Sequence, residues 1–173
     1  HSGVLSSSLA IDKELSKKIF LKNNILTPKY LKFSYRNYKN KLKLIKNLKK
    51  KIGFPLVVKP LNEGSSVNVY ICNKNNVLKI LEKLTEYGEL LLEKYIPGRE
   101  IQVAILADKV LGAIELKPHR KFYDYEAKYN PKAKTEHIIP VEMSKKKYKE
   151  LTKIALKAHK ILNCRGVTRS DFR

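Results

Sequence analysis

The sequence is poor in cysteine and has no tryptophan. Its two cysteines, Cys72 and Cys164, lie too far apart to form a metal-binding pair, so we expect both to be buried, reduced thiols. Apolar runs such as 90–92 are far too short to cross a bilayer, and the first residues lack the layout of a signal peptide. We therefore expect a cytoplasmic protein that has no membrane partner.

Acidic residues are also scarce, and this leaves a large positive charge. The 173 residues include 37 Lys and Arg against 16 Asp and Glu, which gives a formal net charge of +21. Such a charge is typical of proteins that bind nucleic acid, but only six of the basic residues are the arginines that base recognition favours. The lysine runs 49–51 and 145–147 fall at the end and the start of predicted helices, as on a solvated surface. We expect no specific nucleic-acid partner, and a basic nucleic-acid-binding module is the alternative.

Apolar side chains make up 43% of the chain, enough for a core, and their spacing predicts an α+β protein. The turn at Pro97 and Gly98 is the best boundary between two parts. The long polar stretch 118–140 is predicted as a loop, and the chain stops inside a predicted core strand, so we expect a piece of a longer protein. The spacing predicts helices at 9–22, 42–52, 77–87 and 145–162 and strands at 30–34, 56–59, 67–72, 90–96, 101–105, 110–116 and 167–172.

A lysine at the end of a predicted buried strand precedes a small, polar loop. Lys59 ends the strand, and Glu63, Gly64, Ser65 and Ser66 follow. Glycine lets the backbone approach a ligand closely, and amides and hydroxyls of such a loop can hold phosphate oxygens. The spacing matches neither common glycine-rich phosphate fingerprint, so a purely structural hairpin loop is the alternative.

A second group of polar residues closes a strand at the predicted boundary. Glu93, Lys94, Tyr95 and Ile96 end the strand, and Glu100 follows the turn. Ligand clefts form at such boundaries, where exposed backbone can read an adenine edge and a carboxylate can accept ribose hydroxyls. The alternative is an edge strand with solvated charges.

Three tyrosines and a lysine gather within 122–129, inside the long predicted loop. A loop of this composition can act as a lid that excludes water from a reaction. Stacking on a nucleic-acid base and a plain surface loop are the alternatives.

Taken together, these segments resemble the D-alanine–D-alanine ligases, which are members of the ATP-grasp superfamily. The stretch 123–129, Tyr-Asp-Tyr-Glu-Ala-Lys-Tyr, looks like the omega loop of that family and is not general to the superfamily. This loop argues against another ATP-grasp carboxylate–amine ligase, which is the third reading. The remaining matches are 2–13, which looks like the start of the central domain, 54–60 with 63–67, which looks like the phosphate-loop strand and turn, and 139–140 and 169–172.

The resemblance implies an ATP-grasp fold and a known reaction. Residues 1–96 would form the central, nucleotide-binding subdomain and 97–173 part of the C-terminal subdomain, with the omega loop at 118–140 and a nucleotide cleft between the two. Family members use ATP and Mg²⁺ (or Mn²⁺) to join two D-alanines for peptidoglycan synthesis. The first carboxylate attacks the γ-phosphate to give an acyl phosphate, which the second amine then attacks. Whole members of the family would be homodimers.

The resemblance also implies catalytic and metal-binding roles. Lys13 and Lys59 would hold the ATP phosphates and Lys128 the γ-phosphate, because cations stabilise charge on the transferring group. Arg169 would stabilise the oxyanion of the tetrahedral intermediate. Asp171 would bind the magnesium ion, which prefers carboxylate oxygens.

The remaining implied roles concern the nucleotide and the omega loop. Ser65 and Tyr129 would close the omega loop across the site. The implied nucleotide-binding residues are Glu63, Gly64, Ser65 and Ser66 for the phosphates, Glu93, Lys94, Tyr95 and Ile96 for the adenine, and Glu100 for the ribose.

The sequence departs from the family pattern at three places. Asn68 stands where the family usually has glycine, which would stiffen the phosphate hairpin or move its tip. Nothing before His1 corresponds to the N-terminal domain that holds the first alanine, and the Glu and Asn that complete the metal site would lie beyond the last residue. We therefore expect an incomplete fragment that is inactive alone.

Overall fold

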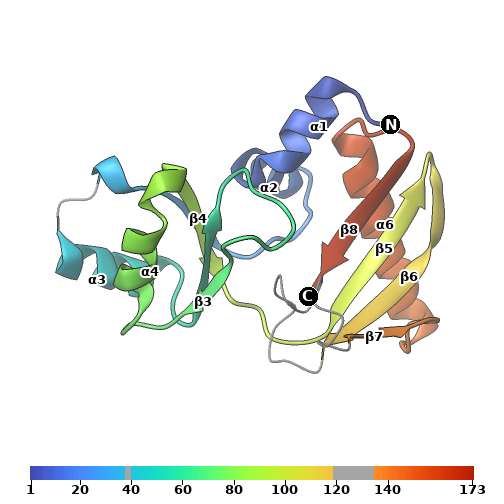
Figure 1. Ribbon diagram of the computed structural model, residues 1–173. Coiled ribbons are helices and arrows are strands. Elements are labelled where there is room, and N and C mark those ends of the chain that lie inside the picture. Colours follow the sequence, from blue (N-terminus) through green and yellow to red (C-terminus); the bar gives the residue numbers. More distant parts are fainter. Residues whose placement is uncertain (38–39, 119–134) are drawn as a thin grey trace. The chain divides into compact units, whose positions relative to one another are not determined.

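The computed structural model describes residues 1–37, 40–118 and 135–173 (Figure 1). These residues form two compact units. The smaller unit comprises 11–14 and 27–96, and the larger unit comprises 1–10, 15–26 and 97–173. The two units meet in sequence between residues 96 and 97, and two N-terminal segments group with the larger unit.

The smaller unit is a four-stranded antiparallel sheet in the order β1-β4-β2-β3. The predicted strands at 30–34, 56–59 and 90–96 are all present, and the hairpin after Lys59 is formed by β2 and β3. Its elements are β1 (Tyr30–Ser34), the 3₁₀ turn η1 (Tyr35–Asn37), α3 (Lys41–Lys51), β2 (Leu56–Pro60), β3 (Tyr70–Cys72), α4 (Val77–Lys83), the 3₁₀ turn η2 (Thr85–Tyr87) and β4 (Glu89–Lys94).

One face of this sheet packs against α3 and α4. Leu56, Val58 and Leu92 of the sheet share a fully buried core with Leu48 of α3 and Leu81 of α4. Because side chains alternate along a strand, the residues between these positions point to the opposite face. That opposite face carries Lys59 of β2 and Glu93 of β4, whereas Lys94 of β4 lies on the side of the core.

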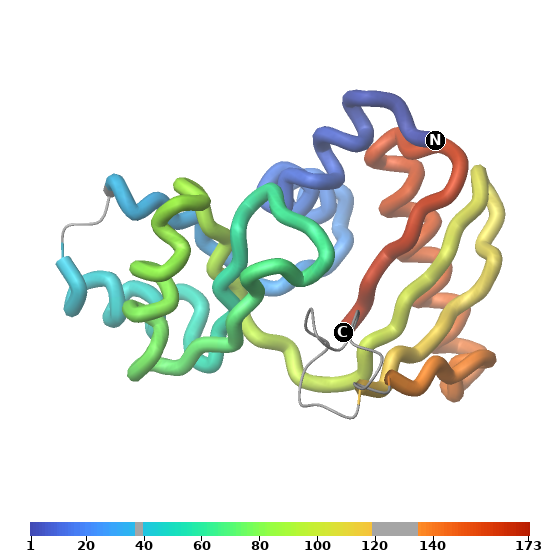
Figure 2. The backbone as a smooth tube through the Cα atoms, viewed as in Figure 1, coloured from blue at the N-terminus to red at the C-terminus, as the bar shows by residue number. Residues whose placement is uncertain are grey.

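The larger unit is a second antiparallel sheet, in the order β7-β6-β5-β8. The helix α6 covers one face, where Val103 and Ile105 pack with Ala155. The red trace of β8 runs alongside β5 in Figure 2. The elements are α1 (Val4–Ile11), α2 (Lys13–Lys22), β5 (Glu100–Leu106), β6 (Lys109–Pro118), β7 (Thr135–Ile138), α6 (Lys145–Ile161) and β8 (Val167–Phe172). The end of α1 and the start of α2, at 11–14, group with the smaller unit.

The mixture of helices and antiparallel sheets confirms the predicted α+β class, but four local predictions were wrong. The single helix predicted at 9–22 is two helices, α1 and α2. The stretch 118–140 contains the strand β7 and is not entirely loop. The strand β8 is alternately exposed and half-buried, and it pairs only with β5 among the described strands, so it is an edge strand and not a core strand. Cys72 is buried, but Cys164 is partly exposed.

The lysine runs, the Cys72 thiol and the lengths of the helices test three more expectations from the sequence. The lysine runs 49–51 and 145–147 do lie at the end of α3 and the start of α6. Burial raises the pKa of the Cys72 thiol to about 12, which keeps it protonated and unreactive. Within 1–37, 40–118 and 135–173, no helix has the length and apolar character that a membrane span requires.

Candidate functional site

The face of the smaller sheet that lies opposite α3 and α4 carries a largely buried ion pair between Lys59 and Glu93. Lys59 lies opposite Leu91, and Glu93 lies opposite Val57, so both side chains point away from α3 and α4. The Lys59 ammonium donates a hydrogen bond to Glu93 Oε1. The two side chains are only 20% and 11% exposed, so this pair sits in the sheet surface and is not a solvated surface pair.

Lys13 brings a second ammonium to the same unit. Its backbone amide donates to Leu61 O at 3.4 Å, and its Nζ donates to Leu61 O at 2.9 Å and also to Glu63 O. These contacts tie the start of α2 to the loop that follows β2. Burial and the nearby Lys59 ammonium lower the pKa of Lys13 to about 8, although Glu63, Glu93 and Asp12 act in the opposite direction.

The two lysines influence each other's charge. The Lys59 ammonium repels that of Lys13 and adds to the effect of burial, which is the larger cause of the lowered Lys13 pKa. A bound polyanion reverses that repulsion, because each of its charges favours the protonated amine. Lys13, Lys59 and Glu93, which the sequence places far apart, are thus brought together in one unit.

The loop after β2 turns sharply beside these lysines. Val67 N donates to Gly64 O at 3.0 Å, and Ser65 and Ser66 adopt left-handed backbone conformations with φ of 51° and 59°. A Cβ added at Gly64 would meet no atom within 4 Å. The fold itself therefore does not require glycine there, and the open space is available to a ligand that approaches the backbone.

The predicted adenine stretch is partly committed to the fold. Lys94 N donates to Lys29 O at 2.8 Å, and Tyr95 N donates to Pro55 O at 3.3 Å. The Lys94 ammonium donates to Phe54 O at 3.2 Å. The expectation of freely exposed backbone therefore fails for these two amides, which leaves the carbonyl oxygens and the Ile96 amide as candidate groups.

Three further predicted site residues, Glu100, Arg169 and Asp171, lie on one face of the sheet of the larger unit. Gln102 lies opposite Asp171 and Ala104 opposite Arg169, so Glu100, Arg169 and Asp171 all point away from the face that α6 covers. Arg169 Nε donates to Asp171 Oδ1 at 2.8 Å, and Arg169 Nη2 lies 3.3 Å from Asp171 Oδ2.

The carboxylates of this face already have cationic partners. Glu100 Oε2 lies 3.3 Å from Arg173 Nη2, and Arg173 also donates to Gly98 O at 2.8 Å. Asp171, the predicted metal ligand, pairs with Arg169, the predicted oxyanion partner. The described part of the chain contains no group of three or more His, Cys, Asp and Glu side chains that could hold a metal ion.

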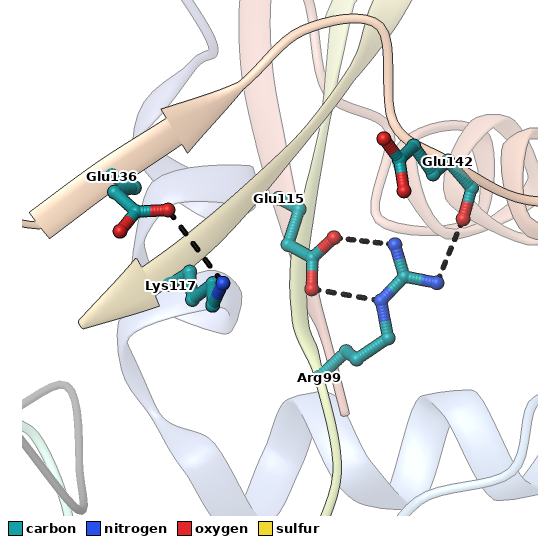
Figure 3. A network of polar contacts seen from close by, with 5 residues as sticks. All are labelled: Arg99, Glu115, Lys117, Glu136 and Glu142. Atoms are coloured by element: carbon teal, nitrogen blue, oxygen red, sulfur yellow. Dashed lines mark hydrogen bonds and ion pairs between the residues drawn. The ribbon is translucent and has the colours of Figure 1, made fainter. Parts of the chain in front are cut away.

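A network that sequence reasoning missed fixes the start of β5. Arg99 Nε donates to Glu115 Oε1 at 2.8 Å, a second nitrogen donates to Glu115 Oε2, and Nη1 donates to Glu142 O at 2.8 Å (Figure 3). These hydrogen bonds lower the pKa of the Glu115 carboxyl. The partners of Arg99 lie 16 and 43 residues away, so no local pattern points to the network.

Two further observations delimit the site. Lys128 and Tyr129 lie outside the residues that the structure describes, so their predicted roles stay predictions.

A pocket of about 420 Å³ in the smaller unit is lined by Arg36, Tyr87 and Glu89 among others, but of the predicted nucleotide-binding residues only Glu63 lines it. Neither lysine lines the pocket, but Leu61 and Glu63, whose carbonyl oxygens accept from Lys13, do line it.

Comparisons with known proteins agree on one family. A family model described as the D-ala D-ala ligase C-terminus matches residues 19–173. A D-alanine–D-alanine ligase of Pelagibacter ubique is 64% identical over 173 residues. The crystal structure of the D-alanine–D-alanine ligase of Bacillus anthracis covers 98% of this chain with a TM-score of 0.82 and 36% identity. The structure of that enzyme complexed with ATP has a TM-score of 0.77 and 34% identity.

The matches cover this chain more completely than they cover the relatives. All of the chain aligns with 56% of the Pelagibacter protein, and it aligns with 54% of the Bacillus chain. The chain thus spans about half the length of the relatives it matches. These structural neighbours confirm the predicted fold.

Proposed function

The chain belongs to the D-alanine–D-alanine ligase family, and we propose that it supplies the ATP-binding part of an enzyme that joins two D-alanines into D-alanyl-D-alanine for peptidoglycan synthesis. The enzyme would act in the cytoplasm as a homodimer, with ATP, D-alanine and magnesium as its partners. The observation that carries the proposal is the pair of ammoniums, Lys13 and Lys59, beside the loop 63–66 in one compact unit.

In this proposal the smaller unit binds the triphosphate. Lys13 and Lys59 offer fixed positive charge, and Gly64, Ser65 and Ser66 offer an open loop with two hydroxyls. Lysine binds phosphate as a point charge, so two lysines can follow two successive phosphates. Lys128 would contact the γ-phosphate, and Tyr129 with Ser65 would shield the reaction from water.

The adenosine would be bound by backbone groups and carboxylates. Because the amides of Lys94 and Tyr95 are used within the fold, the adenine edge would meet the Ile96 amide and the carbonyl oxygens of this stretch. Glu93 would act mainly by orienting the Lys59 ammonium. Glu100 would accept the ribose hydroxyls, and Arg173 holds its carboxylate in place.

The larger unit would supply groups for the reaction itself. Asp171 fits a magnesium ligand because its carboxylate side chain is 46% exposed. The magnesium ion, when bound, neutralises charge on the phosphates. Arg169 would stabilise the oxyanion that forms when the second amine attacks the acyl phosphate. The pairing of Arg169 with Asp171 holds both side chains on the same face.

The proposal is tested by titrating ATP against the chain and three variants. Lys59→Ala removes a charged contact worth about 1.5–3 kcal/mol, so we expect a loss of more than tenfold in ATP affinity. Lys59→Ala also leaves the Glu93 carboxylate without its lysine partner. The double variant Lys59→Ala with Glu93→Gln removes that negative charge, so it distinguishes the loss of the cation from repulsion between Glu93 and ATP. Lys79→Ala, on the exposed surface of α4, is the control for net charge.

The same titration decides between the ligase and the nucleic-acid-binding alternative. A diffuse polyanion surface would lose similar affinity in Lys59→Ala and Lys79→Ala, and its affinity for oligonucleotides would exceed that for ATP and fall steeply with salt. Equal ATP affinity in the original chain and both lysine variants would refute the phosphate assignment.

A further inference from the structure

The end of the candidate phosphate loop is bonded to the body of the smaller unit through Asn68. Asn68 adopts a left-handed conformation with φ of 53°, which asparagine tolerates better than most residues. Its side-chain amide donates to the Tyr87 hydroxyl. Its carbonyl oxygen accepts from the Tyr70 hydroxyl at 3.1 Å. Both sides of one carboxamide are therefore used, on two different elements.

The two tyrosines that bind Asn68 are themselves held. Lys83, the last residue of α4, donates to the Tyr70 hydroxyl at 2.8 Å, and its Nζ lies 4.9 Å from the centre of the Tyr70 ring. Tyr87 is the last residue of η2, and the residue just before η2 is Leu84, which is fully buried. The contacts thus connect the loop to the part of the unit that packs against the hydrophobic core.

We propose that Asn68 is a positioning residue for phosphate binding, and that its carboxamide, held by Tyr70 and Tyr87, fixes the loop that carries Ser65 and Ser66. This inference rests on the proposed ATP site. Glycine at the same position would allow the same backbone conformation but would leave the loop end without any side-chain anchor. An anchored loop has less conformational entropy to lose when it closes on a triphosphate, and its affinity is correspondingly higher.

The test compares ATP with adenosine, because only ATP reaches the loop. Asn68→Gly keeps the left-handed backbone and removes the anchor, while Tyr87→Phe removes one hydroxyl and is the milder change. Isothermal titration calorimetry is expected to show a loss of about five- to tenfold in ATP affinity for Asn68→Gly and unchanged adenosine affinity. The double variant Asn68→Gly with Tyr87→Phe is expected to lose no more ATP affinity than Asn68→Gly alone, because both changes break the hydrogen bond between Asn68 and Tyr87.

Val77→Ala controls for general loss of stability. Val77 is fully buried in the core of this unit and makes neither of the hydrogen bonds that hold the Asn68 side chain, so this variant is expected to destabilise the fold while keeping both partners of Asn68. We expect its ratio of ATP to adenosine affinity to equal that of the original chain.

Each outcome bears on a different part of the reasoning. Unchanged ATP affinity in Asn68→Gly would refute the positioning role while leaving the ATP site intact. Equal losses for ATP and adenosine would also refute it, since the anchor would then act on the whole fold. If the original chain does not prefer ATP over adenosine, the proposed function fails and this inference fails with it.

Discussion

In the proposed site, the lowered pKa of Lys13 would make ATP binding depend on pH. With a pKa of about 8, the Lys13 amine is about nine-tenths protonated at pH 7 and about one-tenth protonated at pH 9, since the ratio of protonated to neutral amine changes tenfold per pH unit. A triphosphate binds the protonated form, so the apparent affinity scales with the protonated fraction. The expected loss between pH 7 and pH 9 is therefore about tenfold.

The assay is calorimetric titration of ATP at several pH values in the original chain and in Lys13→Arg. Arginine keeps its charge throughout this range, so the variant should show a nearly flat profile and also accounts for any titration of ATP itself. A fall of the same size in both proteins, or a flat profile in the original chain, would refute the argument that Lys13 meets the phosphates.

Three further predictions concern stability. The pKa of Lys13 is near 10.5 in the unfolded chain and about 8 in the folded chain, so the unfolded state binds more protons between these two pH values. The contribution of Lys13 to the free energy of unfolding should therefore rise with pH from about 8 to 10.5. Denaturation of Lys13→Met across this range should lack that rise. Arg99→Ala should lower the free energy of unfolding by about 1 kcal/mol, because Glu115 loses its partner but Arg99 is 45% exposed. Lys117→Ala, which breaks the exposed pair with Glu136 at 3.7 Å, should change the free energy of unfolding by less than about 0.5 kcal/mol. Equal effects of the two variants would contradict the burial argument. Leu92→Ala, at a fully buried position, should cost about 2–5 kcal/mol in urea denaturation, and a cost below about 1 kcal/mol would contradict the assigned core.

Much of the fold could be predicted because its signals are local. The short apolar run 56–59 predicts β2, and Ser144 predicts the start of α6, where its hydroxyl accepts from Lys147 N at 3.3 Å. The break between α1 and α2 also had a local signal that was missed: Asp12 accepts from Glu14 N at 2.9 Å, as an asparagine or aspartate does before a helix. The strand β7 had no such signal, because it is only four residues long and mostly polar.

The site was less predictable because it depends on strand register. The Lys59–Glu93 pair joins residues 34 positions apart, and the pairing follows only once β2 and β4 are aligned. The Asn68 contacts depend on where η2 places Tyr87, 19 residues later in the chain. Sequence could identify Asn68 as unusual, but only the contacts of the loop end with β3 and η2 show what its side chain binds.

The central claim is that ATP lies against Lys13 and Lys59, and lysine acetylation measured by mass spectrometry tests it residue by residue. At pH 8 the lowered pKa makes Lys13 about half neutral and hence more nucleophilic than an ordinary lysine. We predict that ATP slows acetylation of Lys13 and Lys59 strongly and leaves the exposed Lys79 unchanged. Protection spread evenly over the lysines, or none at Lys13, would contradict the account.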